Sequence, residues 1–387
     1  MEQMTNSNRR KRFWKVVIGI GLACLAIPPI LGTISLRLMG TDPELDSVGT
    51  LSWSNDLGEL PASKKTPVSV PTPPIRSSFV FSRILSVEDA VQWKGGWIVL
   101  DGRSGAIHLL SSDRGLVGTL GREGQGPGEF QDPVALAVGD SSLWVLNHHG
   151  LELDRYSHSG DPGVAQFHSR RKLTGGGCLA GLAKALVTTS GTGPAILRVC
   201  PATLPGPGTA WVESVQDDGT LSPVLTLPLG TPGSRRLHLM RQPVLTAGTG
   251  HLFLGTWDAP CMATFGRNGE ERDHLCLPEY DRPPTPEGKR AGLERRLGWV
   301  SDLGLLPMDV PAHLPWYDRA FATPGGLVFR RVRTEEERDL VLVTPDGAIS
   351  VTDGWFPENT FVGSTEILVA QDLPQGAKIQ IYPSPWR

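Results

Sequence analysis

The sequence lacks the short motifs by which many enzymes and metalloproteins are recognised. It has no Gly-x-Ser-x-Gly nucleophile elbow, no His-Glu-x-x-His, no P-loop, no EF-hand loop and no Cys-x-x-Cys. It also has little net charge, −3 over 387 residues, whereas 39% of its residues are hydrophobic. That balance excludes a disordered chain and indicates a globular one. No motif identifies a function.

A basic cluster followed by a long apolar run marks the amino terminus. The cluster comprises Arg9, Arg10, Lys11, Arg12 and Lys15. Residues 16–36 contain no charged side chain and are long enough, as a helix, to cross roughly 30 Å of hydrocarbon. The positive-inside rule places residues 1–15 in the cytoplasm and the remainder outside. The sequence therefore predicts a single-pass signal anchor in the inner (cytoplasmic) membrane.

The processing of this segment is open. Gly21-Leu22-Ala23-Cys24 is similar to a lipoprotein box, so cleavage with lipidation at Cys24 is an alternative to an uncleaved anchor. The basic cluster also resembles a twin-arginine export signal with imperfect spacing, and no clean Ala-x-Ala site comes after the apolar run. All of these interpretations export the rest of the chain.

Four of the five cysteines come after the anchor, at Cys178, Cys200, Cys261 and Cys276. An even number of cysteines in an oxidising compartment suggests disulfides. We predict the pairs Cys178–Cys200 and Cys261–Cys276, because each pair falls within one local β segment. Four buried free thiols are the alternative.

Residues 37–78 differ in character from the rest of the chain. Prolines 61, 67, 71, 73 and 74 are interspersed with Ser, Thr and Lys, without apolar periodicity. This composition predicts an extended, semi-rigid linker ahead of a body at 79–387. Residues 37–387 carry a net charge of about −7, which argues against a nucleic-acid partner.

The body has the repeat pattern of a β-propeller. Apolar runs bounded by turn residues begin near residues 97, 143, 185, 252, 327 and 367. Several of the gaps are about 40 to 46 residues, the length of one four-stranded blade. We therefore predict an all-β, six-bladed propeller. The chain ends one strand short of a complete last blade, so an early strand near Phe79–Leu85 is expected to complete that blade and close the ring.

Two insertions, near 201–208 and 282–315, make the boundaries of the third and fourth blades irregular. In the second, Thr285 is a good helix cap and Pro286 fits the first helical position. Leu293, Leu297 and Val300 then recur on one helical face. We predict a helix near 285–300, lying across one end of the propeller.

The most distinctive segment is Gly121-Arg122-Glu123-Gly124-Gln125-Gly126-Pro127-Gly128-Glu129-Phe130. Its glycines indicate positive-φ or closely packed positions, closed by Pro127 and anchored by Phe130. Phosphate binding is disfavoured, because the segment leads into a strand-like run at 134–138 instead of a helix.

Together with Pro133 and the Leu143-Trp144-Val145 strand, this segment resembles bacterial NHL-like six-bladed β-propeller proteins. Such proteins carry this run between their first two blades, and the resemblance extends more weakly over 79–382. It implies a six-bladed propeller that is exported or membrane-tethered, with no activity assigned to most members. Some such propellers are lyases or lactonases with a metal in the central channel, but no ligand set maps onto this chain.

Few side chains stand out as site candidates. His148 and His149 would point to opposite faces of a strand, so we interpret them as turn or surface histidines and assign no metal ligand. His313, Trp316 and Tyr317 are candidates for a ligand-facing rim, with packing beneath the insertion as the alternative. Glu335–Glu337 and the arginines around them are expected to form a solvated hairpin tip.

These observations lead to two functional hypotheses. The first is a binding module on the extracytoplasmic side of a bacterial inner membrane, recruiting a protein or glycan partner. The second is a metal-dependent lyase or hydrolase with its site at the central channel. No motif implies a cofactor, although Ca²⁺ or Zn²⁺ in the channel is not excluded.

Overall fold

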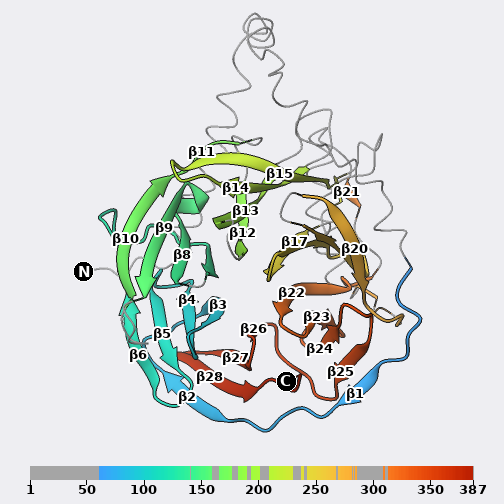
Figure 1. Ribbon diagram of the computed structural model, residues 1–387. Helices are drawn as coiled ribbons and strands as arrows, with labels where there is room; N and C mark the ends of the chain where they lie inside the picture. Colours follow the sequence, from blue (N-terminus) through green and yellow to red (C-terminus); the bar gives the residue numbers. More distant parts are fainter. Residues whose placement is uncertain are drawn as a thin grey trace, which may run out of the picture. The chain divides into compact units, whose positions relative to one another are not determined.

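In a computed structural model, the body folds into six antiparallel sheets around a central axis, as the repeat spacing predicts (Figure 1). The structure describes residues 61–386 except 140, 159–164, 177–181, 190–192, 201–208, 230–236, 239–241, 267–268, 281, 283, 286–307 and 310–312. The predicted tail, signal anchor and first part of the linker lie outside these residues, as does nearly all of the predicted insertion helix. No helix among the described residues is long and apolar enough to span a membrane.

Each blade is a sheet of four antiparallel strands, the innermost first. Blade one contains β3 (Val87–Trp93), β4 (Gly96–Asp101), β5 (Ile107–Ser111) and β6 (Gly115–Leu120). Blade two contains β7 (Ala135–Val138), β8 (Ser142–Asn147), β9 (Glu152–His158) and β10 (Ala165–Lys172). Blade three contains β12 (Leu182–Thr189), β13 (Gly193–Cys200), β14 (Thr209–Val215) and β15 (Thr220–Pro228). Blade four contains β17 (Pro243–Gly248), β18 (His251–Thr256), β19 (Cys261–Phe265) and β20 (Glu271–Cys276). Blade five contains β22 (Tyr317–Thr323), β23 (Gly326–Val332), β24 (Arg338–Val343) and β25 (Ile349–Thr352). Blade six contains β26 (Thr360–Val362), β27 (Glu366–Leu373), β28 (Gly376–Pro383) and, outermost, β2 (Ser77–Phe81).

Short elements complete the architecture. β1 (Val68–Val70) and β11 (Thr174–Gly175) add parallel fifth strands to blades five and three. β16 (Leu237–His238) pairs in parallel with β21 (Met308–Asp309). One turn of 3₁₀ helix, η2 (His148–Gly150), joins β8 to β9.

The core is divided among the spaces between neighbouring blades. Each of six apolar clusters contains residues from two adjacent blades, so every sheet is covered on both faces. A strand buried on both faces has no solvent side, and β4 and β8 accordingly contain only buried residues. This explains the continuous apolar runs of the sequence, which are the second strands of five blades.

The exception is the run near residue 185. It belongs to β12, the innermost strand of blade three, whereas the second strand, β13, begins at Gly193. The spacing of the apolar runs therefore predicts six blades correctly. In blade three, however, the run marks the innermost strand instead of the second strand.

The ring closes through its amino-terminal strand, as predicted. β2 pairs with β28 in antiparallel register, from Ser77 opposite Ile381 to Phe81 opposite Ala377. Gly376, with φ of 149°, lies so close to the backbone of Phe81 that no side chain fits there. Phe79 and Phe81 pack on the apolar cluster between blades six and one. Both ends of the body are thus held in one sheet.

Residues 61–76, which we call the strap, belong to the predicted extended linker, and they lie along the ring. β1 pairs with the outer strand of blade five, and Lys65 Nζ donates to a main-chain oxygen in the β24–β25 turn at 2.8 Å. The N–H and hydroxyl of Thr72 both donate to Asp353 Oδ1, at 2.7 and 2.9 Å. A proline-rich segment has no strand partner of its own, but its extended backbone pairs with an exposed sheet edge. Figure 1 shows the strap in blue along the outside of the ring.

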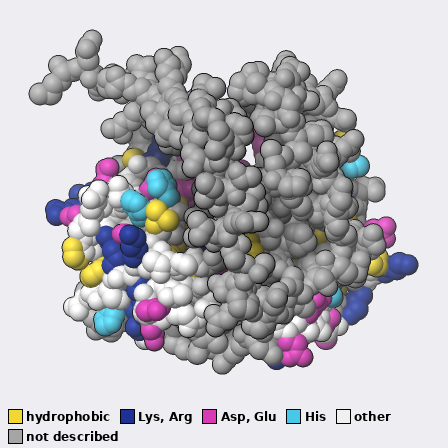
Figure 2. All heavy atoms as spheres, turned by 90° about the horizontal axis from the view of Figure 1, so that it is seen from above, with side chains coloured by type: hydrophobic (Ala, Val, Ile, Leu, Met, Phe, Trp, Pro, Cys, Tyr) yellow, Lys and Arg dark blue, Asp and Glu magenta, His cyan; other side chains and the backbone are white. Residues whose placement is uncertain are grey.

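Figure 2 shows charged side chains of both signs on the described part of one side of the body. In the view of Figure 2, basic, acidic and histidine side chains are intermixed on the part that the structure describes.

Ring closure through β2 predicts that substitutions at two neighbouring residues of this strand differ sharply in their effect on the free energy of unfolding. Phe79→Ala should lower the free energy of unfolding by about 1–3 kcal/mol, because it removes an aromatic ring from the cluster between the first and last blades. Val80→Ala should change it by less than about 0.5 kcal/mol, since that side chain is 69% exposed. Urea unfolding of the two variants measures the difference, and equal effects would contradict this account of closure.

Candidate functional site

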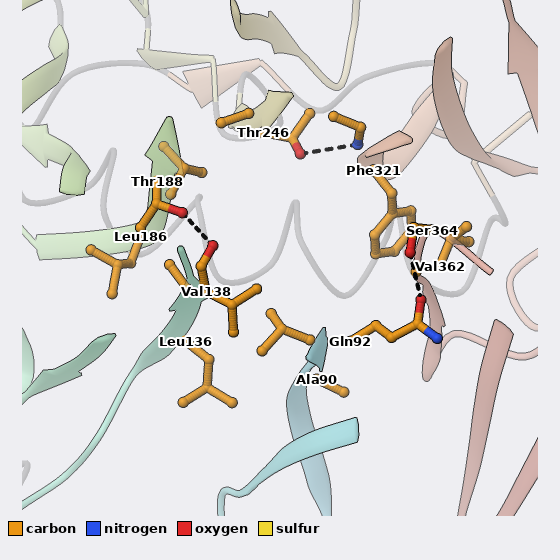
Figure 3. A pocket seen from close by; sticks show the side chains of 16 residues that line it. Ala90, Gln92, Leu136, Val138, Leu186, Thr188, Thr246, Phe321, Val362 and Ser364 are labelled. Carbon is orange, nitrogen blue, oxygen red and sulfur yellow. Dashed lines mark hydrogen bonds between the residues drawn. The ribbon is translucent and has the colours of Figure 1, made fainter. Parts of the chain in front are cut away.

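The innermost strands of the six blades surround an axial cavity of about 260 Å³ (Figure 3). Its lining consists of Ala, Val, Leu, Phe, Gly, Thr, Ser and Gln side chains, with at least two residues from every blade. No acidic, basic, histidine or cysteine side chain is among the described lining residues. We call the end of the ring at which these innermost strands begin the top face.

The polar groups of this cavity are already bonded between blades. The Thr188 hydroxyl donates to the carbonyl oxygen of Val138, from blade three to blade two. The Thr246 hydroxyl accepts from the N–H of Ala322 at 3.3 Å, and the amide oxygen of Gln92 accepts from the Ser364 hydroxyl at 3.0 Å (Figure 3). Innermost strands of neighbouring blades do not pair with one another, so such side chains connect them. The polar groups of the cavity are therefore used to connect neighbouring blades and are not available as unbonded groups for a ligand.

An ion pair joins blades one and five toward the top face. Arg319 Nη1 lies 3.2 Å from Asp89 Oδ1, and the other oxygen of Asp89 accepts from the N–H of Leu136 in blade two at 3.0 Å. The Arg319 guanidinium also lies 4.8 Å from the ring centre of Phe361 in blade six. This one pair therefore contacts four blades.

Glu88 neighbours this pair and has a perturbed acidity. Desolvation by the surrounding protein, followed by repulsion from Asp89 and Asp132, raises the pKa of its carboxyl group, and Arg319 opposes the shift. Negative charge is thus concentrated at the top face between blades one and two.

A set of stacked cations and rings, which we call the array, lies on the top face at blades four and five. It comprises Tyr280, Arg282, Trp316, Arg331, Arg333 and Trp355. Arg333 lies between two rings, 5.3 Å from the centre of Tyr280 and 5.7 Å from that of Trp355. Tyr280 meets Trp316 edge-on at 5.0 Å. The Trp355 side chain is 55% exposed, an unusual surface position for so large an apolar group.

The arginines near Glu335–Glu337 do not form a wholly solvated hairpin tip. The three glutamates are exposed as predicted, but Arg330 and Arg338 are buried and each lies 2.6 Å from an oxygen of Asp318. Arg331 is likewise buried against Asp339. Buried guanidinium groups require such carboxylates, so the pairs are part of the blade rather than of its surface.

The three predicted rim residues do not gather on one surface. Tyr317 is fully buried and meets Phe329 edge-on at 5.0 Å, so its ring packs in the core and is not part of an exposed rim. Trp316 is half-buried within the array. His313 is exposed and forms an isolated bridge with Pro284. A bulge after Tyr317 turns it into the space between blades four and five.

All members of the array except Trp316 are absent from the candidates that the sequence offers: Tyr280, Arg282, Arg331, Arg333 and Trp355. They come from segments that are far apart along the chain, and only the stacking of blades four and five brings them together. Of these five, only the tryptophan at position 355 could have pointed to this surface from the sequence.

The glycine-rich segment has a structural role as the connection between blades one and two. Gly121 and Gly128 have positive φ, and Phe130 is buried between these blades. Glu129 accepts from Arg122 Nε at 2.7 Å and from the N–H of Gly126 at 2.8 Å. Its polar groups are therefore engaged within the loop.

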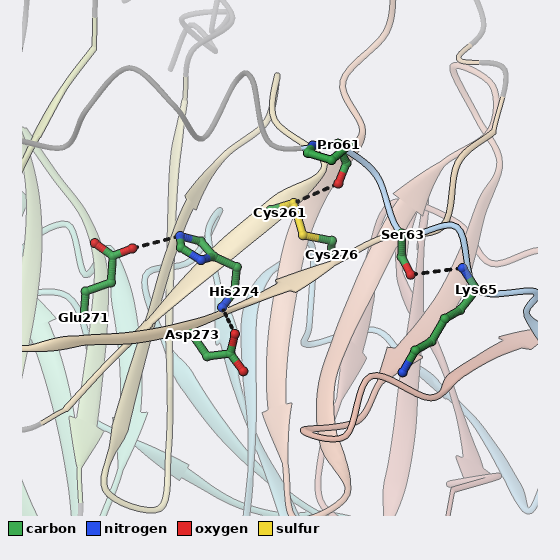
Figure 4. Close-up of a disulfide and its surroundings, with 8 residues drawn as sticks. All are labelled: Pro61, Ser63, Lys65, Cys261, Glu271, Asp273, His274 and Cys276. Atoms are coloured by element: carbon green, nitrogen blue, oxygen red, sulfur yellow. Dashed lines mark hydrogen bonds and ion pairs between the residues drawn. A yellow bond between two sulfur atoms is a disulfide. The ribbon is translucent and has the colours of Figure 1, made fainter.

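A second cavity, of about 320 Å³, lies between the strap and blades four and five (Figure 4). The predicted disulfide Cys261–Cys276 borders it and is confirmed, joining residues directly opposite each other on β19 and β20. Its charged groups have local partners: Lys65 bonds the backbone, and His274 Nε2 lies 2.8 Å from Glu271. Cys200 is also disulfide-bonded. Its predicted partner, Cys178, lies outside the described residues, so that pairing stays a prediction.

The chemistry available along the axis is limited. Among the described residues, no group of three or more His, Cys, Asp or Glu side chains is arranged to hold a metal ion. The arrangement on the top face offers instead aromatic surface, guanidinium groups and carboxylates, which suit non-covalent contacts.

Comparison with known proteins identifies no family for this chain. No family model matches the sequence, and no curated protein matches it. Many solved structures resemble the chain, and three of those at low identity serve as examples. A Bacteroides fragilis protein described as exported has 10% identity and a TM-score of 0.46 over 82% of this chain and 94% of that one. A Myxococcus xanthus glutaminyl cyclase has 12% identity and a TM-score of 0.33 over 82% and 100%. The allergen Mala s 1 of Malassezia sympodialis has 10% identity and a TM-score of 0.44 over 77% and 92%. Membership of the NHL-like family, which the glycine-rich segment resembles, is not shown by these comparisons.

The raised pKa of Glu88 predicts a pH-dependent stability difference. The folded protein binds this proton more tightly than the unfolded chain, so the ionised carboxylate opposes folding at neutral pH, and the opposition vanishes as the pH falls through the raised pKa. Glu88→Gln should therefore raise the thermal midpoint at about pH 7 and leave it almost unchanged at about pH 4. Asp89→Asn, which removes the partner of Arg319, should lower the midpoint at pH 7. A lower midpoint for Glu88→Gln at pH 7 would refute this assignment.

Proposed function

We propose that the chain is a membrane-anchored binding module on the extracytoplasmic side of a bacterial inner membrane, and that the array contacts a protein partner. Residues 16–36 would hold it in the membrane, and the strap would lead from the membrane-proximal segment to the ring. The partner-binding surface would be the top face around Trp355 and Arg333.

The contrast between the axial cavity and the top face carries this proposal. The described lining of the cavity has no titratable side chain, so it offers no general acid or base. The array presents Trp, Tyr and Arg side chains, the residue types that contribute most to protein–protein binding energy. Arg333 is held between two rings, so little conformational entropy is lost when a partner contacts it.

The disulfides support the proposed compartment. Cys261 and Cys276 are bonded across adjacent strands, and Cys200 is also in a disulfide. Disulfides persist in oxidising compartments and are rare in the reducing cytoplasm. The charge distribution of the amino terminus supports the same orientation.

The alternative functions are outcomes that the tests distinguish. A glycan would also stack on an exposed tryptophan. A metal-dependent lyase or hydrolase would need its ligands around the axis, and no described residue of the cavity lining favours it.

Thiol mapping tests the compartment. We expect protein isolated from its native cells, with thiols trapped at lysis, to contain no free thiol at Cys178, Cys200, Cys261 or Cys276. Reduction before trapping should release all four, which serves as the control. Quantitative labelling of Cys261 and Cys276 without reduction would place the body in a reducing compartment.

Photo-crosslinking tests the surface. With a photoreactive amino acid at position 355 of the full chain, we expect discrete adducts in native cells that Arg333→Ala reduces several-fold, because that change removes the cation stacked beside the probe. The same probe at Val80, more exposed but on the outer edge of the ring, is the matched control.

The nature of the adduct separates the candidates. A protease-sensitive adduct supports a protein partner, and one sensitive only to carbohydrate cleavage indicates a glycan. Absence of adducts at position 355, or the same adducts from position 80, would refute the proposed surface.

A further inference from the structure

The turn that carries His148 and His149 has an unusual backbone. Both residues have positive φ, 51° and 56°, and Asp132 beside them has φ of 65°. These are three of the four described non-glycine residues with positive φ. Side chains other than glycine disfavour this region, so a run of such residues needs compensating contacts and often marks a functional position.

This backbone changes how the two side chains are placed. Adjacent residues on a strand point to opposite faces, which is why their sequence positions argue against a shared ligand. They lie instead in η2, outside the strands, with ring centres 6.1 Å apart and planes inclined by 57°. The strand argument therefore does not apply.

Each ring is held at one nitrogen by the preceding loop. His149 Nδ1 lies 3.1 Å from Asp132 Oδ2, and His148 Nδ1 lies 2.7 Å from Gln131 Oε1. The tautomer with its proton on Nδ1 donates to these oxygens and keeps the lone pair on Nε2. This is the arrangement by which proteins orient metal-binding histidines.

The loop that supplies these acceptors is itself fixed. The N–H of Gln131 donates to Asn147 Oδ1 at 2.9 Å, and Nδ2 of the buried Asn147 donates to Asp154 Oδ2. Gly150 packs directly against Ala183 of blade three. Asp132 and Glu88 add negative charge on this side of the top face, since each carboxylate acts electrostatically on the other.

From these contacts we propose that His148 and His149 bind one divalent transition-metal ion, such as Zn²⁺ or Cu²⁺, through their two Nε2 atoms. At the usual metal–nitrogen distance each ring centre would lie about 3.2 Å from the metal, so a separation of 6.1 Å fits two rings that bind one ion from nearly opposite sides. No third described His, Cys, Asp or Glu is arranged to join them, so water or a group from another molecule completes the coordination. This site is independent of the proposed binding function.

Titration of the full-length protein with Zn²⁺ alone tests the proposal. We expect one equivalent to bind, with affinity falling at least tenfold in both His148→Gly and His149→Gly. Glycine is the suitable replacement because both positions have positive φ, so the fold is retained. His274→Ala is the matched control, since His274 is also partly exposed and pairs with a carboxylate, Glu271, on blade four. Zn²⁺ binding that survives both glycine variants, or that His274→Ala weakens equally, would overturn the site.

Two further measurements separate a metal site from a structural histidine pair. With Cu²⁺, the electron paramagnetic resonance spectrum should show two coordinated nitrogens in the wild type and fewer in either glycine variant. Asp132→Asn keeps both rings but weakens the hold on His149 Nδ1, so it should lower the Zn²⁺ affinity several-fold without lowering the metal-free thermal midpoint. A spectrum without two nitrogens in the wild type would contradict the proposal, as would an unchanged affinity in Asp132→Asn.

Discussion

The pairing of β2 with β28 is the contact on which the ring depends. A propeller with a three-stranded last blade would leave β28 as an exposed edge, and its first and last blades would be joined only by side-chain packing. β2 removes that edge and places residues from near position 80 in the same sheet as residues near 380. The strap then continues backward along blade five, so the segment nearest the predicted anchor is itself attached to the ring.

Closure also determines where function can reside. Sheets packed face to face bury both of their surfaces. The innermost strands of adjacent blades are neighbours around the cavity, but they are not hydrogen-bonded to each other as strands of one sheet. Thr188, Thr246 and Gln92 bridge those boundaries, and the Asp89–Arg319 pair does so near the top face. Polar groups at the axis are therefore occupied in holding blades together. Away from the axis, Trp355 of the array and His149 of the His148–His149 turn present accessible surface on the top face.

The sequence predicts the parts of this structure that depend on local periodicity. The six blades, the amino-terminal closing strand and the Cys261–Cys276 disulfide are consequences of apolar runs, turn residues and local spacing. In blade three the sequence pattern misleads. The apolar run near residue 185 is the innermost strand, β12, which is as apolar as the second strands of the other blades. The sequence does not predict that the strap pairs with blade five, since parallel pairing to an edge leaves no periodic signal in the segment that pairs. The array could not be predicted, because Tyr280, Arg333 and Trp355 meet only once blades four and five have stacked.

The glycine-rich segment at 121–130 is the most distinctive part of the sequence, but its contacts say little about function. Glu129 bonds Arg122 and Gly126 within its own loop, and Arg170 of blade two donates to the carbonyl oxygens of Gln125 and Glu129. Phe130 is buried between the blades that the loop connects. These polar groups thus set the angle and contact between two blades, which any propeller of this type needs whatever it binds. Similarity between proteins in such a segment therefore predicts a shared architecture. Ligand specificity must come from surfaces such as the array, whose residues belong to several segments of the chain.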